Sequence, residues 1–165
     1  MSDFMFINSE VQLLKSELTN RLILWVLHAD KIPPHIGLSK NDQFYSLKVS
    51  GKDEGLPVRN VLQIIEKKNI GSLAFEINQS INLSDIKQVF DNYTKAKFNE
   101  VTCLDPIKKI LNVDDAETIH SLLKSLYHQE AISSCTLLHL SSDYKGIPLY
   151  KISDIHSRIN KLEHV

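Results

Sequence analysis

The chain has 165 residues, of which 42% are hydrophobic and 24% are charged, a composition typical of one globular domain with a substantial core. Its 19 lysine and arginine residues are balanced by 20 aspartate and glutamate residues, which argues against nucleic acid or an anionic membrane as a partner. Two cysteines are too few for a disulfide framework or a cysteine zinc site, so we expect a reduced protein with no cofactor and no metal.

The first ten residues lack the basic and apolar regions of a secretory signal, and the longest apolar run, residues 22–27, is too short to cross a bilayer. We therefore expect a soluble, cytoplasmic protein without a membrane span. The sequence does not indicate the oligomeric state.

The first half of the chain is predicted to alternate helices with short strands. Ser9 is a suitable N-cap for an amphipathic helix in which Leu14 and Leu18 recur at helical spacing. The segments that follow are expected to be a strand at 21–28, a hairpin of strands 35–39 and 43–49, a loop at 51–55, a helix at 57–69 and a strand at 70–77. Asn41 and Asp42 tolerate the left-handed backbone of a tight turn, which suits the hairpin.

The second half of the chain is predicted to be mostly helical. Helices are expected at 82–95, 103–112 and 114–132, followed by a two-stranded ribbon at 135–141 and 147–153 and a closing helix at 153–165. The pattern indicates an α+β fold with a mainly antiparallel sheet packed against helices. We expect residues 1–113 to form the core and residues 114–165 to form a helix–ribbon–helix extension packed on it as one unit.

Cys103 and His35 are the residues that could carry chemistry. Cys103 precedes a predicted helix, and the positive end of a helix dipole lowers the pKa of a cysteine there and favours the thiolate. A thiolate is a useful nucleophile when an imidazole holds its charge and later protonates the leaving group. His35, at the start of a predicted strand, could supply that imidazole.

The stretch HIGLSKNDQFYSL, residues 35–47, resembles the histidine hairpin of NlpC-type and lecithin retinol acyltransferase-like thiol enzymes. In the permuted papain-like branch of this group, the hairpin precedes the nucleophile, as His35 precedes Cys103. The resemblance covers roughly residues 20–112. It implies Cys103 as nucleophile, His35 as base and Ser46 as the residue that orients the ring, with Lys48 as the alternative. The family often has His, Asn or Gln as the orienting residue, and the turn here lacks its usual glycine.

The same residues have ordinary structural explanations. His35 could be a hairpin histidine bonded to backbone, and Cys103 could be a small buried hydrophobe, as we expect for Cys135. Gly37 would then be required because a large neighbour crosses its strand. A metal site at His28, Asp30 and His35 lacks a clear further ligand and is disfavoured.

The C-terminal segment admits a winged-helix-like interpretation, in which a helix and a ribbon contact DNA. From Asp114 to Val165, however, seven acidic residues outnumber five basic ones, which is the wrong balance for binding phosphates.

Two functional hypotheses follow. The first is a thiol-dependent hydrolase or acyltransferase that acts on an amide or ester, with a small peptide, a peptidoglycan fragment or a lipid ester as substrate. The second is a non-enzymatic binding or interaction protein of the same fold, in which Cys103 is buried and His35 is structural.

Overall fold

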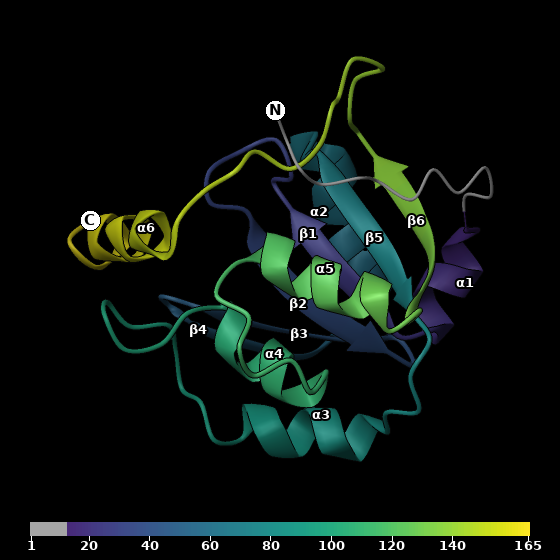
Figure 1. Cartoon of the computed structure of the whole chain (residues 1–165). Coiled ribbons are helices and arrows are strands. Elements are labelled where there is room, and N and C mark those ends of the chain that lie inside the picture. Colours follow the sequence, from purple (N-terminus) through teal and green to yellow (C-terminus); the bar gives the residue numbers. More distant parts are fainter. Residues whose placement is uncertain (1–12) are drawn as a thin grey trace.

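The structure, a computed structural model, describes residues 13–165, so the predicted cap Ser9 lies outside the described residues. A six-stranded sheet with the strand order β4-β3-β2-β1-β5-β6 runs through the molecule, and every neighbouring pair is antiparallel (Figure 1). The predicted α+β class with a mainly antiparallel sheet is confirmed.

The described elements match most of the predicted segments. The strands are β1 (Ile23–Leu27), β2 (His35–Lys40), β3 (Gln43–Lys48), β4 (Gly51–Pro57), β5 (Ser72–Ile77) and β6 (Ile132–Leu138). The helices are α1 (Lys15–Asn20), α2 (Val58–Lys68), α3 (Leu83–Phe90), α4 (Leu104–Ile110), α5 (Ile119–His128) and α6 (Ile152–Glu163).

The hairpin of β2 and β3 turns as predicted, because Asn41 and Asp42 both adopt positive φ, at 48° and 61°. The loop predicted at 51–55 is wrong, since these residues belong to the edge strand β4. The consecutive charged residues Lys52, Asp53 and Glu54 led to the prediction of a loop. Charged side chains are, however, common on edge strands.

The predicted ribbon is also wrong in its second strand. Residues 147–150 have no regular structure; Ile147 and Tyr150 pack into the core instead, and the Ile119 N–H donates a hydrogen bond of 2.8 Å to the Tyr150 hydroxyl. β6 pairs with β5, so the C-terminal third contributes a strand to the one sheet, and no winged ribbon forms among the described residues.

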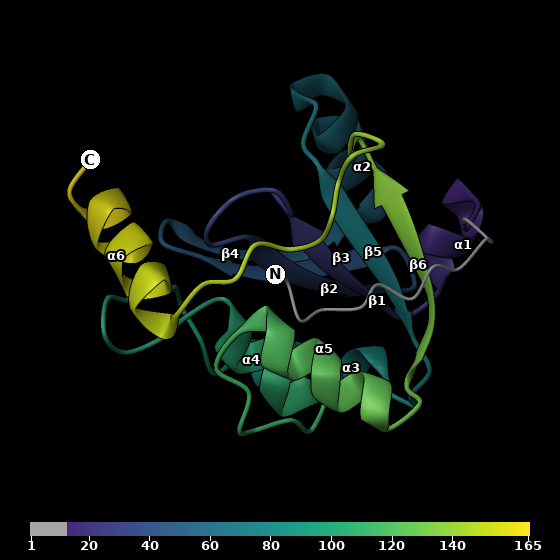
Figure 2. The ribbon, with the colours of Figure 1, turned by 45° about the horizontal axis from the view of Figure 1, so that its top comes forward.

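Helices cover both faces of the sheet. Figure 2 shows α3, α4 and α5 below the sheet and α2 above it. On the α2 side, Leu18 of α1 and three residues of α2 pack with Trp25 and Phe44 in one apolar cluster. Within residues 13–165, no helix is both long and apolar enough to span a bilayer.

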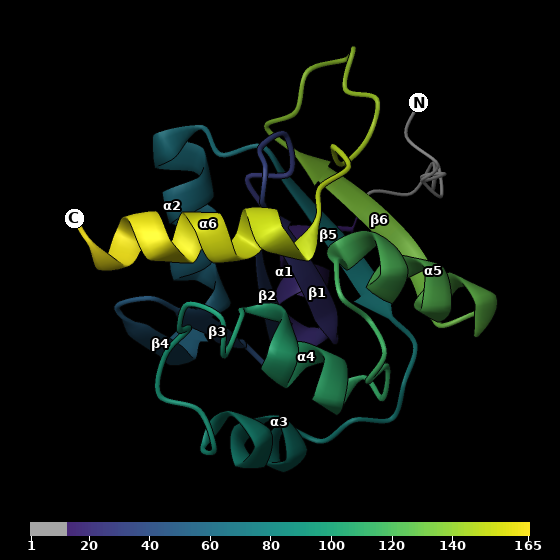
Figure 3. The same cartoon turned by 60° about the vertical axis from the view of Figure 1, so that its left-hand side comes forward.

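The C-terminal helix α6 stands apart from the other helices in Figure 1, and in Figure 3 it crosses in front of α2 and the sheet. Its buried residues Ile155 and Ile159 join the larger apolar cluster. At the loop before α4, the Asn99 N–H donates to Nδ1 of His156 over 2.9 Å, and the Phe98 N–H donates to Oε1 of Glu163 over 3.2 Å. Only one side of α6 is therefore fixed to the rest of the molecule.

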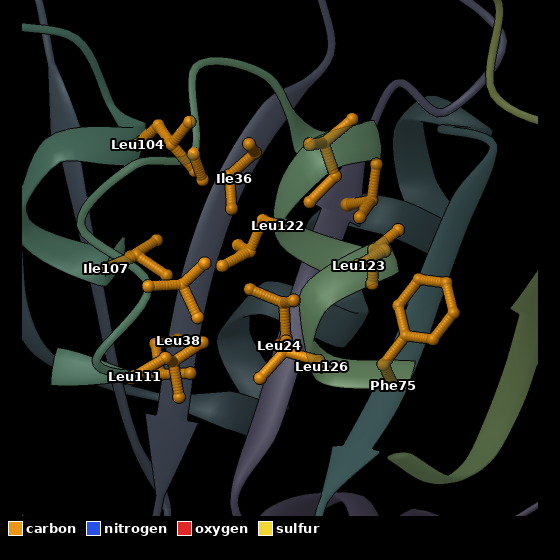
Figure 4. Packing of buried hydrophobic residues seen from close by; sticks show 14 of the residues in the cluster. Leu24, Ile36, Leu38, Phe75, Leu104, Ile107, Leu111, Leu122, Leu123 and Leu126 are labelled. Carbon is orange, nitrogen blue, oxygen red and sulfur yellow. The ribbon is translucent and has the colours of Figure 1, made fainter. Parts of the chain in front are cut away.

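The larger cluster fills the space between the sheet and α3, α4 and α5. Leucine, isoleucine and phenylalanine side chains from the two layers interdigitate there (Figure 4), among them Leu24, Ile36, Leu38, Phe75, Leu104, Ile107, Leu111, Leu122, Leu123 and Leu126. Because α5 and β6 complete this cluster, residues 114–165 are part of the core.

Candidate functional site

A groove of about 1650 Å³ lies between α6, α2 and the adjoining end of the sheet. We call it the α6 groove. Its lining comes from five stretches of the chain: residues within 27–35, 44–56, 61–70, 95–103 and 155–164. Both His35 and Cys103 line it, so the two predicted residues border one hollow although they come from different layers of the fold.

His35 points toward the α2 side of the sheet. Its strand partner Leu27 packs against the α2-side cluster, whereas its neighbour Ile36 belongs to the larger cluster, and successive side chains of a strand alternate between faces. Burial lowers the pKa of His35 to about 4, so the ring is neutral at pH 7. Its Nε2 atom is buried and has no hydrogen-bond partner among residues 13–165.

Cys103 lies on the other face, where it is half-buried against the larger cluster. The sequence predicted a lowered thiol pKa; the structure corrects this, because burial raises the pKa of Cys103 to about 11. Asp105, in the first turn of α4, raises the pKa further, and its Oδ2 already accepts a hydrogen bond of 2.6 Å from the Thr102 N–H. The carboxylate thus offsets the helix dipole that would favour a thiolate.

Within the described residues, Cys103 and His35 share no hydrogen bond, and neither is among the groups that act electrostatically on the other. The thiol interacts with the Ile36 backbone, while the imidazole projects from the opposite face of the same strand. Pleating explains the separation, since a one-residue step along a strand reverses the side-chain direction.

Ser46 does not hold the His35 ring either. Its hydroxyl donates to Oδ2 of Asp53 over 2.8 Å, and Lys48 Nζ donates to Oδ1 of the same carboxylate over 2.8 Å. Asp53 acts electrostatically on His35 and is the acid that the sequence did not single out. Period-two alternation along residues 51–57 would have placed Asp53 on the same face as Ser46, its partner in the sheet.

The rim of the α6 groove exposes large apolar side chains. Ile32, Ile64, Phe98 and Leu162 are 53%, 44%, 39% and 42% exposed, and they come from four separate segments. Apolar side chains that gather at a hollow are typical of interaction sites, whereas isolated ones are ordinary surface residues.

The groove also carries an excess of positive charge. Six lysine or arginine residues line it (Lys31, Lys48, Lys68, Lys95, Lys97 and Arg158), against the three carboxylates of Asp53, Glu100 and Glu163. Lys48 and Lys31 form ion pairs with aspartates, but none of the other four cations does so within the described part of the chain.

Three of these cations act electrostatically on His28, the residue that follows β1. Burial lowers the pKa of His28, and the charges of Lys31, Lys68 and Arg158 lower it further, with Asp30 acting in the opposite direction. The loop after β1, the end of α2 and the middle of α6 thus form one positive corner of the groove.

The other predictions from the sequence concern Gly37, Cys135 and a metal site. A Cβ atom on Gly37 would overlap the Phe44 ring, so a large neighbour does cross that strand. Cys135 is buried in the larger cluster, as predicted. In residues 13–165, no group of three His, Cys, Asp or Glu side chains is arranged to hold a metal ion.

In comparisons with known proteins, no family model, no curated protein and no solved structure matches the chain. The resemblance to the permuted papain-like thiol enzymes therefore stays a prediction.

Proposed function

We propose that this protein is a non-enzymatic binding module whose α6 groove holds a segment of a partner protein bearing acidic and apolar side chains. The observation that carries the proposal is the meeting of four exposed apolar side chains and six cations in one hollow. The chain as a whole has a formal net charge of −1, so this local positive excess is not a general property of the surface.

Charge complementarity favours an acidic occupant. A hollow lined by one sign of charge raises the local concentration of oppositely charged groups and speeds their association. Lys68 and Arg158 line the groove and act electrostatically on His28, and neither forms an ion pair with another described residue. A carboxylate of the ligand would supply the missing negative charge.

The size and spread of the groove favour a peptide segment over a small metabolite. Small-molecule pockets usually enclose about 300–1,000 Å³, and the α6 groove exceeds this range. Its cations are distributed over several segments, from Lys31 near β1 to Lys95 before α4. Several separated negative charges, as on a peptide, match this distribution better than one anionic headgroup.

A peptide selection tests the proposal. The whole chain, immobilised, is used to select from a displayed library of random 12-residue peptides. We expect enrichment of Asp and Glu together with Leu, Ile, Phe or Trp, because these complement the rim of the groove. Enrichment of basic or uncharged peptides, or no enrichment, would overturn the proposal.

Matched variants locate the binding. Ile64→Asp places a charge on the groove rim, and Ile152→Asp places the same charge on a similarly exposed residue outside the groove lining (44% and 42% exposed). We expect the first variant to lose the selected peptides and the second to retain them. Equal binding to both variants would show that the peptides bind elsewhere.

Thiol hydrolysis is kept as a second candidate because Cys103 and His35 line the same groove. Alkylation by iodoacetamide separates the two functions, with Cys135→Ala used so that Cys103 is the only thiol. The binding module predicts slow alkylation at pH 6 that rises only toward high pH, since the pKa of Cys103 is raised to about 11. Rapid alkylation at pH 6 that is lost in His35→Ala would instead support the hydrolase.

A further inference from the structure

The His35 ring is a feature of the α6 groove that the packing of the sheet does not account for. Its Nε2 atom is buried beside the groove without a hydrogen-bond partner in residues 13–165. A buried polar atom without a partner costs about 1–3 kcal/mol, so such atoms call for an explanation in function or in a bound group.

Asp53, the nearby carboxylate that could accept a hydrogen bond from His35, already accepts hydrogen bonds from two other side chains. Asp53 is close enough to act electrostatically on the ring, but Ser46 and Lys48 each donate to one of its two carboxylate oxygens. No hydrogen bond joins Asp53 to His35 in the structure. The imidazole therefore has a nearby negative charge but no direct acceptor.

We infer that His35 is the specificity-determining residue of the groove, where Nε2–H donates a hydrogen bond to a carboxylate of the bound peptide and the ring gains a proton as the peptide binds. This inference rests on the proposed function. A carboxylate against the ring stabilises the imidazolium, so the complex holds a proton that the free protein releases.

The charges around the ring set the direction of the effect. Asp53 of β4 favours the protonated ring, whereas Lys48 of β3 and His28 of the loop after β1 disfavour it. Lys68 of α2 and Arg158 of α6 act on His28 in turn. The segment before α4 adds Lys95, Lys97 and Glu100 to the groove. An acidic ligand offsets this positive surplus, and that raises the pKa of the bound ring.

Proton-linked calorimetry tests the inference. The most enriched peptide of the selection is titrated into the whole chain at pH 6 in buffers of different ionisation enthalpy. We expect uptake of up to one proton in the unmodified chain and a clearly smaller uptake in His35→Gln, which keeps a hydrogen-bond donor but cannot ionise. The affinity of the unmodified chain should rise from pH 8 to pH 5.5, by at most about tenfold per pH unit.

Controls separate this inference from the proposed function. His128→Gln, at an exposed position outside the groove lining, should keep the full proton uptake. The same peptide with Asn and Gln in place of its acids should bind more weakly and without proton uptake. Peptide binding with equal proton uptake in His35→Gln would overturn only the role of His35, whereas no binding by any variant would overturn the groove itself. Should His35→Gln fail to fold, ¹⁵N spectra of the ring in the unmodified chain decide, because an Nε2 resonance unmoved by the peptide contradicts the inference.

Discussion

Apolar side chains are shielded from solvent more completely between the sheet and α3–α5 than at the α6 groove. Between the sheet and α3–α5, Leu122, Leu123 and Phe75 are fully buried and side chains from both layers fill the space (Figure 4). At the α6 groove, Ile32 and Ile64 remain about half exposed. The first region explains why the chain folds, and the second exposes apolar and cationic groups that folding alone does not need. Stability and binding should therefore respond to different residues.

Removing a side chain from the closed region should have the largest effect on stability. Leu122→Ala leaves a cavity in the larger cluster, and such changes lower the free energy of unfolding by about 2–5 kcal/mol. Ile64→Ala, at the groove, should cost below about 1 kcal/mol. Urea unfolding measures both values. Equal losses would mean that the groove is as much a part of the core as the α5 side.

Gly37 tests the packing on the α2 side of the sheet. Gly37→Ala forces its new methyl group against the Phe44 ring, and overpacking of this kind costs about 1–3 kcal/mol. Phe44→Leu in the same chain should recover part of the loss, so the double-mutant cycle should show coupling between the two positions. Additive effects in thermal unfolding would contradict the close approach of this ring.

The burial of His35 predicts that the free energy of unfolding depends on pH. The unfolded chain protonates His35 near pH 6.5, while the folded chain protonates it only near pH 4 because the ring is buried. The unfolded state therefore binds more protons between these values, and the free energy of unfolding falls as the pH is lowered through this window. The fall is at most about 1.4 kcal/mol per pH unit.

His35→Gln serves as the comparison for that measurement. Urea unfolding of both chains at several pH values between 7 and 4 should give a shallower fall for the variant, since its side chain does not titrate. Parallel curves would show that the ring is solvated in the folded protein.

Charge reversal at the groove should have the smallest effect on stability. Lys68→Glu and the matched Lys124→Glu of α5, which is exposed and outside the groove lining, should each change the free energy of unfolding within about 0.5 kcal/mol. Only Lys68→Glu should weaken the selected peptide, by about two- to fivefold in fluorescence anisotropy. Equal weakening by both variants would point to the net charge of the chain as the cause.

The sequence predicts the local elements well because their causes are local. Asn41 and Asp42 mark the turn of the hairpin, and Pro57 immediately precedes α2. It predicts β4 poorly, since charged residues on an edge strand resemble a loop until their pairing partner is known. The strand alternation already separates His35 from Ile36, but only the structure shows that Cys103 packs on the Ile36 side.

The groove itself is a long-range feature. Its walls come from segments as distant as Ile32 and Leu162, and nothing in either segment alone indicates that they meet. Cys103 and His35, the two residues singled out from the sequence, both line the groove. The strand register does not support the nucleophile and base roles expected of them.

Methyl NMR with a selected peptide tests the central claim most directly. Isoleucine and leucine methyl groups of the whole chain are observed as the peptide is added. The claim predicts shifts at Ile32, Ile64 and Leu162, with Leu137 on the edge strand β6 and Leu122 in the closed core unchanged. Shifts centred on Leu137, with the three groove residues unmoved, would contradict it.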